Sequence, residues 1–176
     1  MTYRATERLH PIDGTRIELE AEVPFATLRA AFEAEVPELD TDLLRSLLGS
    51  GADWSTLTRS LAGPGSHRLV RFWSGDPTAV MRAGGVDLPS VGYLIGDYAT
   101  AARMFRHDAG TALYTPFRVE LHAAGEGRTV LSADQPSAPL RNFGNNKITQ
   151  AGYELDRMLG DLLEDLGLPR PSVLRL

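Results

Sequence analysis

The chain has 176 residues, of which 43% are hydrophobic, so it is long enough for one well-packed domain over residues 1–176. Its formal net charge is −5 and its basic residues are scattered, which excludes the basic patch typical of nucleic-acid-binding proteins. No stretch approaches the roughly 20 apolar residues that span a bilayer, and residues 1–8 lack the apolar segment of a signal peptide, so we expect a cytoplasmic protein without a membrane partner.

The first predicted element is a half-buried strand over residues 15–23, where apolar side chains alternate with charged ones. Pro24 suits a first helical position, and Phe25, Leu28 and Phe32 follow at helical spacing. The chain therefore begins with a strand and a short helix that each present one apolar side.

Residues 36–65 have a helical and loop-like pattern that sets them apart from the elements on either side. Asp40 or Thr41 can cap a first short helix, and Asp53 or Ser55 can cap a second. We expect this stretch to be a helical insertion, and an insertion beside a common core is one way to build a lid over a site.

A strand–helix unit carries the densest cluster of ionisable residues. After a strand over residues 68–73 and a helix of about two turns, residues 92–96 form an apolar run fit for a buried strand. Asp97 supplies the carboxylate that a helix start needs, and residues 98–108 follow as a helix with one apolar side. Gly110 can take the left-handed conformation that closes the helix.

Three basic residues, Arg103, Arg106 and His107, lie three and four positions apart in the last turn of this helix. If they face a hollow, the arginines can hold an anion while His107, next to Asp108, acts as a general base. The alternative is structural, because cations at a helix C-terminus interact favourably with the helix dipole. The pattern makes His107 and Asp108 candidate catalytic residues, and Arg103 and Arg106 candidate ligand contacts.

A β-hairpin is predicted next, and its register follows from its turn. A three-residue loop at residues 125–127 places Leu121 opposite Leu131, whereas a two-residue loop would place a charged residue there. We choose the three-residue loop, which also sets Arg118 across from Asp134. Arg118 is a further candidate ligand contact.

The longest predicted helix covers residues 146–166, where Leu155, Leu159 and Leu162 belong to one apolar stripe. We expect this stripe to pack on the sheet; the alternative is that a partner subunit covers its edge. Lys147 is the only lysine among the 18 Lys and Arg residues, a bias typical of high-GC bacterial genes. We interpret Lys147 as a solvated residue near the helix start.

The order of these elements favours an α+β fold. About five strands, an antiparallel hairpin and helices of uneven length fit a two-layer sandwich. In this architecture a mostly antiparallel sheet carries helices on one face, and the short helical insertion is added to it.

Aromatic residues supply the remaining candidate ligand contacts. Tyr93, Tyr98 and Tyr114 can line an apolar pocket and offer hydroxyl groups to a ligand, although aromatic residues at these spacings also suit an ordinary core. The four histidines show no metal-ligand spacing and the chain has no cysteine, so we expect no metal site. We expect no cofactor either.

Three segments carry a familiar pattern: YLIGD at 93–97, TAARMFRHD at 100–108 and LYTPFRV at 113–119. They resemble the bacterial and archaeal family known as domain of unknown function 302, over roughly residues 85–166. The resemblance implies a small α+β domain that forms homodimers and for which no activity is generally established. The chain departs from many members by having Asp97-Tyr98 in place of Asn-Pro, and by a longer stretch at residues 36–65.

The expected function is that of a homodimeric domain that binds a small, organic or anionic ligand. The alternative, from a different class, is a cofactor-independent enzyme of bacterial specialised metabolism, in which His107 or Asp108 moves a proton and the segment around Trp54 closes the site. A third hypothesis is a subunit that uses the apolar stripe from Leu155 to Leu166 to bind another protein.

Overall fold

The computed structural model describes residues 4–175, so Met1 to Tyr3 of the polar segment 1–8 and Leu176 lie outside the described residues. Five strands form one open sheet in the order β1-β5-β4-β3-β2, and every neighbouring pair is antiparallel. In chain order the strands are β1 (Arg16–Ala21), β2 (Val70–Gly75), β3 (Ser90–Gly96), β4 (Phe117–Ala123) and β5 (Thr129–Asp134). The prediction of a mostly antiparallel sheet of about five strands is confirmed.

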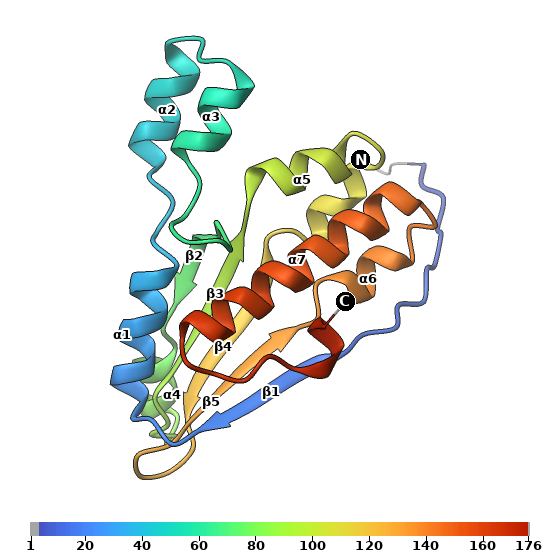
Figure 1. Cartoon of the computed structure of the whole chain (residues 1–176). Helices are drawn as coiled ribbons and strands as arrows, with labels where there is room; N and C mark the ends of the chain where they lie inside the picture. Colours follow the sequence, from blue (N-terminus) through green and yellow to red (C-terminus); the bar gives the residue numbers. More distant parts are fainter. Residues whose placement is uncertain (1–3, 176) are drawn as a thin grey trace.

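Seven α-helices and two short 3₁₀ helices lie within residues 4–175. They are α1 (Phe25–Glu35), α2 (Thr41–Gly49), α3 (Trp54–Ser60), α4 (Thr78–Ala83), α5 (Tyr98–Phe105), η1 (Ala109–Leu113), α6 (Ser137–Arg141), α7 (Asn146–Asp165) and η2 (Ser172–Leu174). Figure 1 shows α1, α6 and α7 together in front of the sheet. The α+β fold, with helices packed on one face of the sheet, is therefore confirmed.

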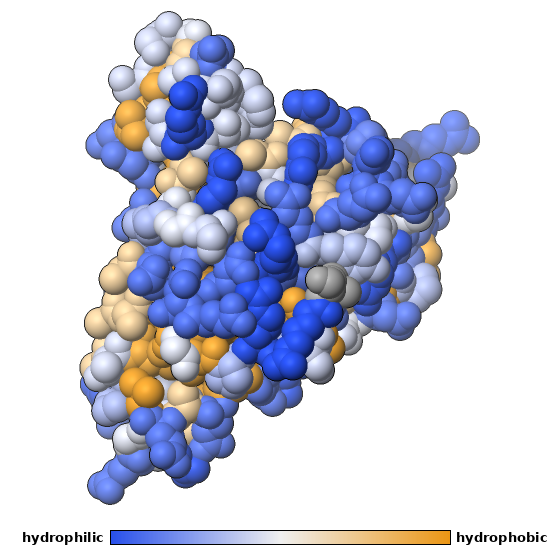
Figure 2. Space-filling view, in the orientation of Figure 1, coloured by the Kyte–Doolittle hydropathy of each residue, from blue (hydrophilic) through white to orange (hydrophobic). Residues whose placement is uncertain are grey.

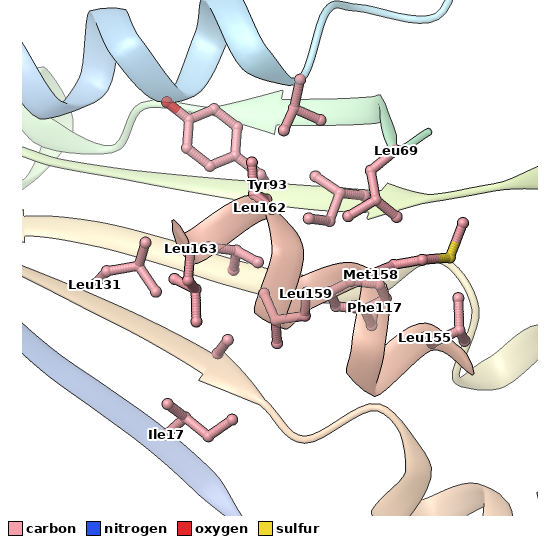
Figure 3. Packing of buried hydrophobic residues seen from close by; sticks show 14 of the residues in the cluster. Ile17, Leu69, Tyr93, Phe117, Leu131, Leu155, Met158, Leu159, Leu162 and Leu163 are labelled. Atoms are coloured by element: carbon pink, nitrogen blue, oxygen red, sulfur yellow. The ribbon is translucent and has the colours of Figure 1, made fainter. Parts of the chain in front are cut away.

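The core lies between α7 and the sheet. Leu155, Leu159 and Leu162 of α7 are fully buried, and Figure 3 shows them beside sheet residues such as Tyr93 and Phe117. Burying an aliphatic side chain of this size contributes roughly 1.5–3 kcal/mol, so this stripe is a main source of stability. Because the sheet covers it, the stripe is not available to a protein partner.

A buried polar network fixes α7 against α6. The carboxylate of Asp156 is fully buried and accepts hydrogen bonds from Ser137 N at 2.8 Å, Ser137 Oγ at 2.6 Å and Gln135 Nε2 at 3.0 Å. Burial raises the pKa of the Asp156 carboxyl, and the hydrogen bonds from Ser137 and Gln135 oppose that shift. The network joins the end of β5 to the middle of α7.

The hairpin of β4 and β5 has the predicted register. Leu121 lies opposite Leu131 on the helix-covered face. On the other face Arg118 Nη2 lies 2.6 Å from Asp134 Oδ2. The three-residue turn is confirmed, because a one-residue slip would have reversed these faces.

Helices α2 and α3 form an arm, residues 41–60, that extends away from the sheet at one end of the molecule (Figure 1). Asp40 accepts a hydrogen bond from Leu43 N at 2.7 Å, and Asp53 accepts one from Thr56 N at 2.7 Å, so both capped helices are confirmed. Neither helix has a buried residue. Within residues 4–175 no helix is long and apolar enough to cross a membrane.

Candidate functional site

Helix α5 is held at its start by a buried carboxylate. Asp97 is only 4% exposed and accepts hydrogen bonds from Thr100 N at 2.8 Å and Thr100 Oγ1 at 2.9 Å. Met104, fully buried, anchors the other end of the helix against the core. These two fixed points determine which way the remaining side chains of α5 face.

The helix ends earlier than the sequence predicted. It stops at Phe105, with Arg106 as its C-cap, instead of continuing to residue 108. The physical reason is Asp108, whose carboxylate accepts a hydrogen bond from Gly110 N at 2.7 Å and so starts η1 as a separate helix.

Basic residues at the C-terminal end of α5 and just after it face a cavity of about 400 Å³ between α5 and α7, which we call the cationic hollow. Its lining joins this end of α5 to the first turns of α7: Arg103, Arg106, His107, Lys147, Gln150, Ala151 and Glu154. Asn145 caps α7 by accepting a hydrogen bond from Lys147 N at 2.9 Å, so the positive end of the α7 dipole also lies at this hollow.

The charges in the cationic hollow are unbalanced. Arg103 pairs with Glu154, whose carboxylate is the hollow's one negative group. Among residues 4–175, Arg106 and Lys147 form no ion pair. The hollow therefore has an excess of positive charge even when His107 is neutral, and it suits an anion.

The structure does not bring His107 and Asp108 together. The side chain of His107 lines the cationic hollow, whereas Asp108 lines a separate cavity of about 320 Å³ with Tyr114 and Phe143. The carboxylate of Asp108 is engaged by Gly110 N. Two neighbours in sequence thus face different hollows.

The other sequence candidates lie at four different places. Arg118 lies on the uncovered face of the sheet, paired with Asp134. Tyr93 belongs to the core, where its ring stacks on Phe32 at 4.6 Å between centroids and its hydroxyl donates to Glu33 Oε1 at 2.9 Å. Burial and that hydrogen bond raise the pKa of the Tyr93 hydroxyl.

Tyr114 packs edge-on against Phe143, with 6.0 Å between ring centroids, in the cavity that holds Asp108. Among the candidate tyrosines, Tyr98 lies next to the cationic hollow, because Tyr98 lines an apolar cavity that has Arg106 in common with the hollow. Burial raises the pKa of the Tyr98 hydroxyl, as expected beside apolar side chains.

Sequence reasoning missed the contribution of α7 to the cationic hollow. The prediction of a solvated Lys147 agrees with its exposure but does not place it at the hollow, and Gln150 and Glu154 carry no signal of their own. The available clue was that Lys147, Gln150 and Glu154 follow one another at helical spacing on the polar side of α7. Their meeting with α5 depends on the packing of two helices, which spacing alone does not specify.

A second cluster of ionisable groups lies where α1, α7 and the chain before β2 meet. His67 is fully buried, and one ligand-type atom each of His67, Glu35 and Asp165 lie within 4.8 Å of one another. His67 Nε2 lies 3.9 Å from Glu35 Oε2 and has no hydrogen-bond partner among residues 4–175. Burial lowers the pKa of the His67 imidazole, against the opposing effect of Asp165 and Glu35.

The hydrogen bonding of His67 argues against a metal ion at this cluster. Its Nδ1 accepts a hydrogen bond from Leu69 N at 3.0 Å, so the proton of the neutral ring is on Nε2. A metal would need a free electron pair on Nε2 and a donor at Nδ1, which is the reverse arrangement. The absence of a metal site stays a prediction.

A family model described as domain of unknown function DUF302 matches residues 56–166, more than half of the chain. The chain belongs to the DUF302 family. The DUF302 match starts within α3 and ends at the C-cap of α7, so it contains both walls of the cationic hollow. It begins further upstream than the resemblance at residues 85–166, and α2 and Trp54 precede it.

The crystal structure of an uncharacterized conserved DUF302 protein from Bacillus stearothermophilus is similar, with a TM-score of 0.58 and 12% sequence identity. The similarity covers 86% of this chain and 97% of that chain. At this identity it shows the shared fold and nothing about ligands. None of the curated proteins matches the chain.

Proposed function

We propose that this DUF302 protein binds a small oxyanion, the carboxylate or phosphate group of an organic molecule, in the cationic hollow. The observation that carries the proposal is that Arg106 and Lys147, from two different elements, face one cavity without an ion-pair partner among residues 4–175. An arginine matches the geometry of carboxylate and phosphate groups, and a lysine adds a compact charge.

The ion pair between Arg103 and Glu154 leaves room for such a ligand. Both side chains are partly exposed, at 50% and 35%, and exposed pairs of this kind contribute only about 0–1 kcal/mol. An incoming anion can therefore compete with Glu154 for Arg103 at little cost. Gln150 offers an amide donor on the same side of α7.

The geometry favours binding over acid–base catalysis. An enzyme that uses His107 and Asp108 needs both groups within reach of one substrate, and these side chains line separate cavities. An enzyme in which His107 or Asp108 alone moves a proton stays a prediction. The cytoplasmic location stays a prediction.

Calorimetric titration with sodium phosphate at constant ionic strength tests the proposal. The wild type should bind phosphate saturably, and Arg106→Gln and Lys147→Gln should each weaken binding by roughly tenfold or more. Arg118→Gln is the matched control, because Arg118 is an exposed arginine on the other side of the sheet. Equal binding by wild type and the Arg106→Gln, Lys147→Gln double variant would overturn the proposal.

We further propose that the chain forms a homodimer through the uncovered sheet face. Trp73, 55% exposed, and Leu94 provide apolar surface there, next to the ion pair of Arg118 and Asp134. The indole of Trp73 lies over Gly75 and Gly92, since a Cβ added at these glycines would come within 2.2 Å and 3.8 Å of its ring. Exposed aromatic side chains are typical of protein interfaces.

Sedimentation velocity at micromolar concentration tests the homodimer. We expect a dimer for the wild type, a monomer for Trp73→Glu and a dimer for Trp54→Glu, which changes the other exposed tryptophan at a site away from the sheet face. A monomeric wild type would contradict the proposal.

A further inference from the structure

An apolar groove runs between the arm and α5, and Arg106, which also lines the cationic hollow, is part of its lining. Its first part, about 240 Å³, lies under the arm and is lined mainly by Leu44, Leu48, Trp54, Leu57, Leu61 and Tyr98. Its second part, about 400 Å³, lies along α5 and is lined mainly by Trp54, Tyr98, Ala101, Ala102, Phe105 and Arg106. The two parts share Trp54 and Tyr98, so they lie next to each other on the surface.

The groove collects apolar side chains that the fold itself leaves uncovered. Leu48 is 61% exposed, Trp54 47% and Phe105 56%, and α2 and α3 bury no residue in the core. Figure 2 shows the recess between the arm and the body, with apolar and strongly hydrophilic atoms side by side over α5. Large apolar side chains gathered in a concave surface are typical of ligand-binding sites.

Arg106 connects the groove to the charged site. It lines both the second part of the groove and the cationic hollow, where Lys147 stands without an ion-pair partner among the described residues. An apolar groove that has one arginine in its lining is complementary to a molecule with a hydrocarbon tail and a negatively charged head.

We propose that the natural ligand is a free single-chain amphiphile with an anionic head, of the alkyl carboxylate class. Its head pairs with Arg106, which borders both the groove and the cationic hollow, and its tail lies in the apolar groove between Trp54 and Tyr98. This inference rests on the proposed function and adds the chemical class of the ligand. The groove is elongated from Leu44 to Arg106, which suits a flexible chain more than a compact ring system.

The charges of the arm favour a free amphiphile over a membrane surface. The arm and its caps carry Asp40, Asp42 and Asp53 on the outside, against Arg45 and Arg59. The arm therefore offers no basic patch that would attract an anionic bilayer, and the cation that attracts the head, Arg106, lies at the other end of the groove.

Fluorescence titration of Trp54 tests the inference. The chain has two tryptophans, so a Trp73→Phe background leaves Trp54 as the only indole. Decanoate is the probe, kept below its micelle concentration, and acetate has the same head without the tail. We expect decanoate to shift the Trp54 emission to shorter wavelength saturably, and to bind at least about 100-fold more tightly than acetate because its methylene groups leave water.

Two substitutions separate the contribution of the ligand's head to binding from that of its tail. Arg106→Gln should weaken the binding of decanoate by roughly tenfold or more. Leu48→Gln should weaken the binding of decanoate and leave the binding of inorganic phosphate unchanged. Leu88→Gln is the control for Leu48→Gln, since Leu88 is also exposed but lies before β3, outside the groove. Circular dichroism of each variant shows whether its fold is intact.

The outcomes distinguish this inference from the proposed function. If phosphate binds in the cationic hollow but decanoate binds no more tightly than acetate, the proposed ligand class is wrong, whereas the proposed oxyanion site is supported. If neither phosphate nor decanoate binds, both proposals fail. Undiminished decanoate binding by Arg106→Gln, or binding only to vesicles of phosphatidylglycerol, would overturn the assignment of a free anionic amphiphile.

Discussion

Trp54 of α3 and Arg106 at the end of α5 line the same cavity of about 400 Å³. The two residues belong to segments that precede and follow two strands of the sheet, so only the folded chain brings them together. One supplies an apolar surface and the other a positive charge. Their proximity is the relationship from which the proposed ligand class follows.

Replacement of Asp97 should loosen α5 and with it the cationic hollow. Asp97→Ala removes the acceptor for Thr100 N and Thr100 Oγ1, and the expected loss of unfolding free energy is about 1–2 kcal/mol. Urea denaturation measures this loss. Asp97→Asn keeps a side-chain oxygen at the cap and should lose clearly less; equal losses for the two variants would show that capping is not the role of Asp97.

Removal of the Asp156 carboxylate should be among the most destabilising single changes. Asp156→Ala leaves Ser137 N, Ser137 Oγ and Gln135 Nε2 buried without their acceptor, and we expect a loss of at least about 3 kcal/mol in thermal or urea unfolding. Ser137→Ala removes one side chain of the network and should cost about 1 kcal/mol. A smaller loss of unfolding free energy for Asp156→Ala than for Ser137→Ala would contradict this account.

Two glycine substitutions should have opposite effects. A Cβ at Gly152 would lie 3.1 Å from Ser137 Cα and 3.3 Å from Leu140 Cβ, so Gly152→Ala forces α6 and α7 apart and should cost about 1–3 kcal/mol. No atom lies within 4 Å of a Cβ at Gly49, the last residue of α2, so Gly49→Ala should stabilise the chain by up to about 1 kcal/mol. Differential scanning calorimetry of both variants checks the contrast.

His67 should make folding stability depend on pH near neutrality. The unfolded chain takes up a proton on this imidazole near pH 6.5, whereas the lowered pKa in the folded state delays that step to lower pH. Stability is therefore full above pH 6.5 and is lost as the pH falls. The negative charges of Asp165, Glu35 and Asp161 favour the protonated ring and limit the loss.

The measurement is the unfolding free energy at pH 7.5 and pH 5.5 for the wild type and His67→Gln. When the pH falls from the higher to the lower of these values, the wild type should lose more unfolding free energy than the variant, because glutamine does not titrate. The same pH dependence in both proteins would show that His67 does not contribute to it.

The features that the sequence predicted depend on local rules. The register that pairs Leu121 with Leu131 follows from the length of the turn and the alternation of side chains. The cap at Asp97 follows from the residues that helix starts require, and the same rule limits the two caps of the arm to Asp40 or Thr41 and to Asp53 or Ser55. Each of these predictions concerns residues close in the chain, where geometry leaves few alternatives.

The composition of the site depends on tertiary packing, which the sequence did not specify. Asp108 is next to His107 in the chain, yet the start of η1 turns its carboxylate away from the cationic hollow. The hydroxyl of Tyr93 makes it a candidate ligand contact by sequence, but in the structure that hydroxyl donates a hydrogen bond to Glu33. Lys147 joined the site only because α7 crosses beside α5.

The most direct test of the cationic hollow is NMR detection of the arginine side-chain Nε–Hε resonances during a titration with phosphate. The Arg106 resonance should shift saturably, since its guanidinium contacts the anion, while that of Arg118 should stay in place on the far side of the sheet. An Arg106 resonance that does not move at phosphate concentrations that saturate the calorimetric signal would contradict the account.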